Sequence, residues 1–458
     1  MARAHAGYLT ETPYIAQFWR EHAPLWLGAT LAALGRSAPA RSGTRWCELG
    51  CGPGVGLLIH AASNPSIDFH GVDINPDHID EARDLARAAG IGNAQFHLAD
   101  FSAAGALPDF DYIISQGVYS WVSPEVRAAI RAFMGRKLRP GGVALLHYLS
   151  TPGASDLVAL HGLFRALHRQ PGATLEGAVE QGRAIIETLL ANKAGYFTAH
   201  PAAAYKARQL ATDALNYAIH DYLNDFYAPQ PSARVMQEMG EVGLHFAGSA
   251  VPENNIDDFS VPQGLRALFA RQASPELRET VRDLAGNQFS RMDLYLRDGA
   301  PLSADRHFAA LHRLRFRALP GLPPEGRVTF SSLIGPIEGP ADVFGPVLSR
   351  LARQEAVSYA QIEALPALAG SPALANQILH SLMGAGAIHP EADPMPAPDA
   401  ARRLNAVLLE RHRQGGFVPA LAAPALGSGL SLDKALLDDL AAGKPVPAAV
   451  ARLLPDPA

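Results

Sequence analysis

The chain has little cysteine, little lysine and no long apolar run. Two cysteines occur in 458 residues, which is too few for a zinc site or a disulfide framework, so we expect no bound metal. The formal net charge is −5 and basic residues form no block, which argues against nucleic acid as the partner. No stretch of about 18 apolar residues is present, which argues against membrane insertion. With no apolar segment at the amino terminus, we expect a cytoplasmic protein.

Apolar residues make up 48% of the chain, and its length suits two or three domains. Strand-like and helix-like segments alternate between residues 41 and 150, which predicts a doubly wound α/β sheet with five parallel strands. We expect a helical lid over 1–40, the sheet core over 41–150, a helical insert over 151–230, two strands that complete the sheet within 231–300, a linker and a small winged-helix-like domain over 301–400, and a tail over 401–458.

A Gly-rich loop follows the first predicted strand. The segment 46–56 reads as strand, tight turn and helix start. Glycines at 50, 52 and 54 let the backbone approach a ligand closely, and the next helix would point free N–H groups at it. Glu48, just before the turn, would repel a phosphate and attract an ammonium. The loop therefore favours an aminoacyl-nucleoside over a dinucleotide.

Polar and aromatic residues also stand where the next strands end. The sequence interval between Glu48 and Asp73 is close to the interval expected between a Gly-rich loop and a ribose-binding acid. Asp100 and Phe101 end the third strand, where an acid and a ring suit a purine's amino group and face. The carboxyl ends of parallel strands meet at one edge of the sheet, so these residues should share a site. The expected ligand contacts are Glu48, Gly50, Gly52, Gly54, Asp73, Ile74, Asp100, Phe101, Gln116 and Gly117.

These motifs in this order resemble the class I S-adenosylmethionine-dependent methyltransferases. Residues 48–54 look like that family's first motif, Asp73 stands where its ribose acid stands, and Asp100 with Phe101 stand where its adenine contact stands. The resemblance implies a Rossmann-like sheet and S-adenosyl-L-methionine as the cofactor, with S-adenosyl-L-homocysteine as the product.

A narrower similarity, over roughly residues 5–300, is to methyltransferases that carry a methyltransferase regulatory domain. It rests on the segments 110–125, 217–224 and 276–288, and on Gly7, Tyr8 and Tyr14. Bacterial protein-lysine methyltransferases belong to this group, with a helical dimerisation insert. The similarity implies Tyr8 as a cofactor contact, a methyl acceptor in a protein, and a homodimer through the insert.

One segment departs from that group's pattern. After the fifth strand the group usually reads Tyr-Asn-x-x-Pro-Gly-Trp, whereas this chain has Tyr148 to Ala154 without the Asn and the Trp. Both missing residues should lie near the acceptor. The substrate implied by the group is therefore in question, and the cofactor is not.

Methyl transfer from a sulfonium needs positioning, exclusion of water and an unprotonated nucleophile. Tyr119 and Trp121 are expected either to form an aromatic wall that attracts a cation or to pack beneath the insert. The aromatic residues of the first 40 positions either cover the ligand or pack. We name Tyr119, His147 and Tyr148 as catalytic candidates and Tyr14, Trp121 and His220 as substrate-binding candidates.

Three functions remain open at this point. The first is N-methylation of a protein lysine. The second is N- or O-methylation of a small molecule in a biosynthetic pathway, which the altered segment after the fifth strand favours. The third is a non-catalytic regulatory protein that binds S-adenosylmethionine, against which the intact Glu48, Asp73 and Asp100 argue.

Overall fold

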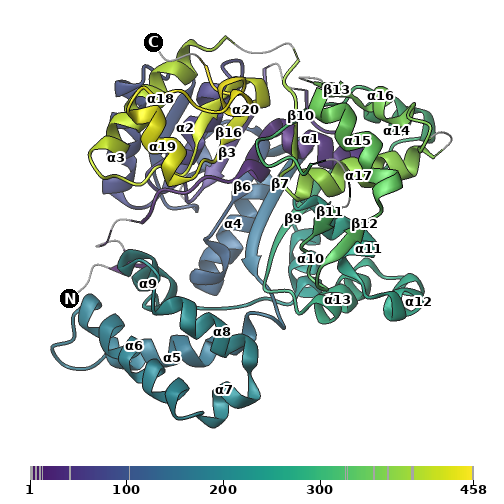
Figure 1. The fold of residues 1–458 in the computed structure, drawn as a ribbon. Helices are drawn as coiled ribbons and strands as arrows, with labels where there is room; N and C mark the ends of the chain where they lie inside the picture. The colour runs from purple at the N-terminus through teal and green to yellow at the C-terminus, as the bar shows by residue number, and fades with distance from the viewer. Residues whose placement is uncertain are drawn as a thin grey trace.

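A seven-stranded sheet forms the centre of the molecule (Figure 1). The computed structural model describes residues 4–5, 8–9, 12, 14–40, 43–102, 104–324, 326, 328–353, 356–368, 371–393 and 397–455. The strand order is β5-β4-β3-β6-β7-β9-β8. The strands are β3 (Arg45–Leu49), β4 (Asp68–Asp73), β5 (Ala94–Leu98), β6 (Phe110–Ser115), β7 (Leu138–Leu149), β8 (Leu244–Ser249) and β9 (Ser290–Arg297).

The first five of these strands run parallel, and β9 is antiparallel to both of its neighbours. This confirms the predicted α/β sheet of Rossmann-like order. The strand order reverses on either side of β3, because β4 and β6 flank it. Ligands of open α/β sheets bind at such a switch point, beyond the carboxyl ends of the strands.

Helices with clear start signals connect the parallel strands. Asn75 caps α3 by accepting a hydrogen bond from Asp77 N–H at 3.0 Å, and Ser123 caps α4 through Val126 N–H at 3.3 Å. In both helices a proline follows the cap, where no backbone donor is needed. The connecting helices are α2 (Val55–Ser63), α3 (Pro76–Ala88) and α4 (Pro124–Lys137).

Residues 139–142 bulge out of the pairing between β6 and β7, because Phe110 pairs with Leu138 and Tyr112 pairs with Val143. One local prediction is wrong. Residues 14–19 were expected to be mostly helical and instead form an irregular segment, followed by α1 (Pro24–Ala33). This segment is held by distant partners: His60 on α2, for example, lies 3.1 Å from the carbonyl oxygen of Trp19.

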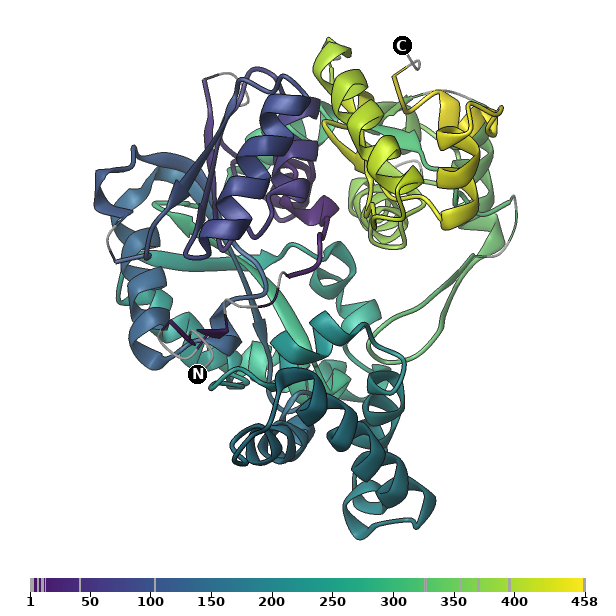
Figure 2. The ribbon, with the colours of Figure 1, turned by 90° about the vertical axis from the view of Figure 1, so that its left-hand side faces the viewer.

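The insert after β7 is helical, as predicted. Its helices pack around an apolar cluster of their own that includes Phe164, Val179 and Ile219. The insert projects from the lower side of the sheet (Figures 1 and 2). Its helices are α5 (Val158–His168), α6 (Leu175–Ala191), α7 (Gly195–Ala199), α8 (Pro201–Leu210) and α9 (Leu215–Tyr222).

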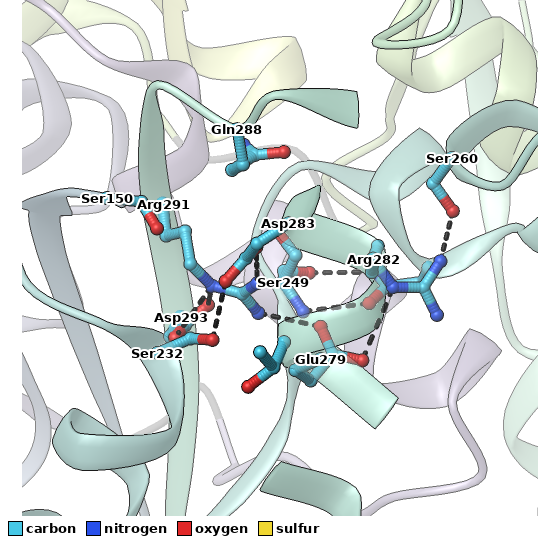
Figure 3. Close-up of polar contacts among 12 residues, drawn as sticks. Ser150, Ser232, Ser249, Ser260, Glu279, Arg282, Asp283, Gln288, Arg291 and Asp293 are labelled. Atoms are coloured by element: carbon cyan, nitrogen blue, oxygen red, sulfur yellow. Dashed lines mark hydrogen bonds and ion pairs between the residues drawn. The ribbon is translucent and has the colours of Figure 1, made fainter. Parts of the chain in front are cut away.

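A buried ion network joins β9 to the helices beside it (Figure 3). The helices are α10 (Ser232–Gly240) and α13 (Pro275–Gly286). The guanidinium of Arg291 lies 2.9 Å from Asp293 and 2.7 Å from Glu279, and it also pairs with Asp283. Ser232 donates to Asp283 at 2.5 Å. The network fixes the antiparallel half of the sheet.

The chain then forms a second apolar core, which α1 shares. A small antiparallel sheet has the order β13-β10-β14. The winged-helix interpretation of this region stays a prediction. Its main elements are α14 (Ala304–His312), β10 (Arg315–Ala318), α15 (Ala341–Arg353), β13 (Val357–Ser358), α16 (Tyr359–Glu363), α17 (Pro372–Gly384) and β14 (Ile388–Pro390).

The last segment folds back onto α2 and α3 (Figure 1). Leu404 of α18 (Asp399–Arg413) belongs to the same apolar cluster as Leu58 of α2. The side-chain amide of Asn64, just after α2, donates to the carbonyl of Gly427 at 2.8 Å. The rest of this segment comprises β15 (Leu421–Ala423), β16 (Ser428–Leu430), α19 (Lys434–Ala441) and α20 (Ala448–Ala451).

Candidate functional site

The Gly-rich loop joins β3 to α2 with three residues of positive φ. Gly50, Gly52 and Gly54 have φ of +80°, +54° and +71°, a region that side chains disfavour. A Cβ at Gly50 would stand 2.4 Å from Val118, and one at Gly54 would stand 2.7 Å from Ala82. A Cβ at Gly52 would meet nothing within 4 Å. Packing thus requires the first and third glycines, while the second leaves room for a ligand.

Asp73 ends β4 and is fixed on both carboxylate oxygens. One oxygen accepts a hydrogen bond from Gly52 N–H at 2.9 Å, and the other accepts one from Asn75 N–H at 2.8 Å. The Nδ1 atom of His78 lies 3.5 Å from the same carboxylate. Asp73 therefore holds the loop and, with Ile74, faces the cavity beside it. A carboxylate fixed in this way is suited to a ribose.

The far end of this cavity combines an acid with apolar walls. Asp100 accepts a hydrogen bond from Ser102 N–H at 2.7 Å. Phe101, Val122 and Val126 line the space next to it. A mostly apolar space beside a carboxylate fits a purine ring with an exocyclic amino group.

Glu48 lies on the other side of the loop. Its side chain is 12% exposed, and His22 Nδ1 lies 3.6 Å from it. Burial, and secondarily the charge of Asp73, raise the pKa of Glu48 to about 8. An ammonium next to this carboxylate would favour its charged form. The glycine loop, Asp73, Asp100 and Glu48 together fit the nucleoside and amino-acid halves of S-adenosylmethionine.

Three cavities meet at one point of this site. Tyr14, Gln116 and Gly117 line all of them. The first cavity contains Asp73 and Asp100, and the second contains Glu48 and the glycine loop. The third, of about 480 Å³, extends under the insert. The structure therefore brings the predicted cofactor contacts around two adjoining cavities that open towards a third.

The third cavity has aromatic walls and charged groups from the insert. Trp121 and His147 come from the sheet side, as the sequence suggested. Sequence reasoning missed Asp213, Asp221 and Lys206, although Asp221 stands inside a quoted motif, directly after His220. The insert also contributes three tyrosines, which are Tyr217, Tyr222 and Tyr227.

His147 lines this cavity as a neutral ring. Its Nδ1 accepts a hydrogen bond from Gly117 N–H at 3.2 Å, and its ring stacks on Trp121 at 6.4 Å between centroids. Burial lowers the pKa of His147 to about 4. The Nδ1 lone pair is thus occupied, and the ring positions the Gln116–Gly117 loop.

Two predicted catalytic residues lie outside the three cavities. Tyr119 is fully buried, and its hydroxyl accepts from Arg131 at 2.5 Å and donates to Glu238 at 3.2 Å. Tyr148 is fully buried too and donates to Asp293 at 2.7 Å. Because a catalytic group must reach the substrate, these two tyrosines are not part of the site that we propose.

Residues 14–19, which we call the strap, cross the point where the three cavities meet. The backbone N–H of Tyr14 donates to His78 Nε2 at 3.1 Å, and the ring of Tyr14 makes an edge contact with His220 at 5.0 Å. His220 Nε2 lies 2.8 Å from the carbonyl oxygen of Thr12. His220 therefore positions the strap. The side chain of Tyr8 lies outside the described residues.

Two family models match this chain. A methyltransferase domain matches residues 40–187, and a "predicted methyltransferase regulatory domain" matches residues 214–297. The first covers the cofactor loop and all five parallel strands. The second covers α9, α10, α13 and the last two strands of the sheet.

Two curated relatives are similar in sequence to this chain over part of their length. An uncharacterised protein of Synechocystis sp. is 32% identical over 314 residues, which cover 68% of this chain and 62% of that protein. An uncharacterised protein of Rickettsia prowazekii is 31% identical over 178 residues, or 39% of this chain and 32% of that protein. The chain therefore spans less than two thirds of the length of these two relatives.

A solved structure shares the fold over nearly the whole chain. PKMT2 from Rickettsia typhi in complex with AdoHcy superposes with a TM-score of 0.71 at 18% identity, over 94% of this chain and 88% of that chain. A second structure of PKMT2 gives a TM-score of 0.67 at 17% identity. The chain thus contains a match to a methyltransferase domain and a match to a methyltransferase regulatory domain, and it shares its fold with PKMT2.

Proposed function

We propose that this protein transfers a methyl group from S-adenosylmethionine to the side-chain amine of a lysine in a protein substrate. The observation that carries the proposal is the third cavity. It opens from the cofactor site, its walls are aromatic, and Asp213 and Asp221 line it. A long apolar stem that ends in a cation fits such a space, since rings attract a cation and carboxylates neutralise it.

The cofactor, when bound, supplies a methyl group activated by a sulfonium. The protein has to orient an amine, keep water out and remove a proton. Tyr14 of the strap lines the place where the cavities meet, and the rings of Trp121 and Tyr222 line the third cavity next to it. The shared fold with PKMT2, whose name denotes a protein lysine methyltransferase, also supports a lysine acceptor.

A small-molecule amine or alcohol is the second candidate acceptor. The chain has Leu149 where the similar group has Asn, and Leu149 lines the third cavity. This exchange removes a polar group from the wall. The acceptor can therefore differ from that of the group, even with the same cofactor site.

A methyl-transfer assay separates the candidates. Purified protein is incubated with radiolabelled S-adenosylmethionine and a bacterial lysate, which is then split into protein and small-molecule fractions. We expect the label in the protein fraction, on methyllysine after acid hydrolysis. Label in metabolites alone would support the second candidate, and cofactor binding without any transfer would indicate a regulatory protein.

The homodimer through the insert stays a prediction. Exposed apolar side chains on the insert, among them Val158, Leu189 and Tyr205, are the surface that it would use. Among the described residues, no helix combines the length and the apolar character needed to cross a membrane.

A further inference from the structure

We propose that Asp221, held by Tyr217, binds the ammonium of the methyl acceptor and takes one proton from it before transfer. This inference rests on the proposed function, in that it supposes an amine acceptor. Both residues lie on α9 of the insert and line the third cavity. The insert would thus supply the base, while the sheet supplies the cofactor site.

The geometry places Asp221 on the cavity wall with one firm partner. The hydroxyl of Tyr217 donates a hydrogen bond to its carboxylate. Tyr217 and Asp221 are one helical turn apart, so their side chains lie on the same face of α9. The bond leaves the other acceptor positions of the carboxylate available to a cation.

The groups that face Asp221 come from several elements. Asp213 lies just before α9, and Lys206 lies on α8. The ammonium of Lys206 is placed 4.7 Å from the centre of the Phe289 ring. The other titratable groups around the same cavity are Tyr14, His147, Tyr222 and Tyr227.

Burial and the groups around Asp221 together make this carboxylate suitable as a proton acceptor. Burial raises the pKa of Asp221 to about 7; Asp213 adds to this rise, and Tyr217 and Lys206 oppose it. Burial likewise raises the pKa of Tyr217, Tyr222 and Tyr227, so these hydroxyls stay protonated. A base whose pKa lies near neutrality is both ionised in part and able to hold a proton.

His147 is the alternative base on the same wall, and its placement disfavours it. Its Nδ1 already accepts the Gly117 N–H, and its low pKa makes it a weak acceptor. In the proposed step, an N–H bond of the ammonium breaks and an O–H bond forms on Asp221. The amine keeps the electron pair with which it attacks, and Asp221 later returns the proton to solvent.

A binding experiment tests this without methyl transfer. Trp19 and Trp121 line the cavity, so intrinsic fluorescence reports its occupancy. The full chain, saturated with S-adenosylhomocysteine, is titrated with n-butylamine and with n-butanol as a neutral match. We expect saturable binding of the amine only, weakened at least about tenfold in Asp221→Asn. Glu187→Gln, which removes an exposed carboxylate of α6, should bind the amine like the unaltered protein.

The pH dependence gives a readout that a structural role would not move. Amine affinity should rise between about pH 6 and about pH 8, because the carboxylate ionises while n-butylamine stays charged. This rise should vanish in Asp221→Asn and persist in Asp221→Glu. S-adenosylhomocysteine affinity should be equal in all variants, which shows that they are folded.

Three results would overturn the assignment of Asp221. These are no saturable amine binding, equal amine binding in Asp221→Asn, or butanol binding as tightly as the amine. None of them depends on which fraction carries the label in the transfer assay. Label confined to metabolites would instead overturn the lysine acceptor and leave the result for Asp221 standing.

Discussion

At the scale of single residues, Glu48 links cofactor binding to pH. Its pKa is raised to about 8 by burial and by Asp73, so at neutral pH the carboxyl is mostly protonated before binding. An ammonium placed next to it lowers this pKa, so binding must release a proton. We expect the affinity for S-adenosylhomocysteine to increase from about pH 6 to about pH 8.

Calorimetry checks this directly. At neutral pH the heat of binding should differ between buffers of different ionisation enthalpy, by the amount that proton release requires. Glu48→Gln should abolish the difference. Heats that are independent of the buffer in the unaltered protein would show that Glu48 does not face the ammonium.

The cofactor side of the site could be predicted from the sequence, and the acceptor side only in part. Glu48 and Asp73 lie at the ends of β3 and β4, Asp100 follows β5, and parallel strands bring their carboxyl ends to one edge. Asp213 and Asp221 belong to the insert. No periodic rule ties a helical insert to the edge of a sheet, so only the folded chain shows that they face the cofactor site.

At the scale of elements, the ion network of β9 and α13 should dominate the stability of the antiparallel half. Arg291→Met would leave Glu279, Asp283 and Asp293 buried without their shared cation, which costs about 3–5 kcal/mol. Arg234→Met removes a 64% exposed guanidinium from a pair with Glu238 and should cost at most about 1 kcal/mol. Urea unfolding of both variants measures the difference, and equal losses would contradict it.

Elements were predictable where a local signal agreed with the final packing. Ser123 and Pro124 start α4 as the sequence indicates, because the cap is satisfied within one turn. The pair Gly141–Gly142 likewise marks the bulge that interrupts the pairing of β7 with β6 between Leu138 and Val143. The strap at residues 14–19 depends on His78 and His60, which no local pattern reveals.

At the scale of the whole molecule, the last segment is part of the cofactor half. Leu404 is fully buried against the core of α2 and α3. Leu404→Ala should therefore lower the free energy of unfolding by about 2–5 kcal/mol. Leu284→Ala, at a side chain that is 65% exposed, should change it by at most about 0.5 kcal/mol. Equal unfolding midpoints in urea would show that the segment is not integral to the core.

The contact between Asn64 and Gly427 joins positions 363 residues apart. During synthesis, the helix that bears the cofactor loop leaves the ribosome long before the surface that covers it. At a synthesis rate of about 5–20 residues per second, the delay is roughly 20–70 s. Throughout that interval the nascent chain displays the bare side of α2, which a chaperone can recognise, and the cofactor-binding half reaches its final form only after translation has passed residue 427.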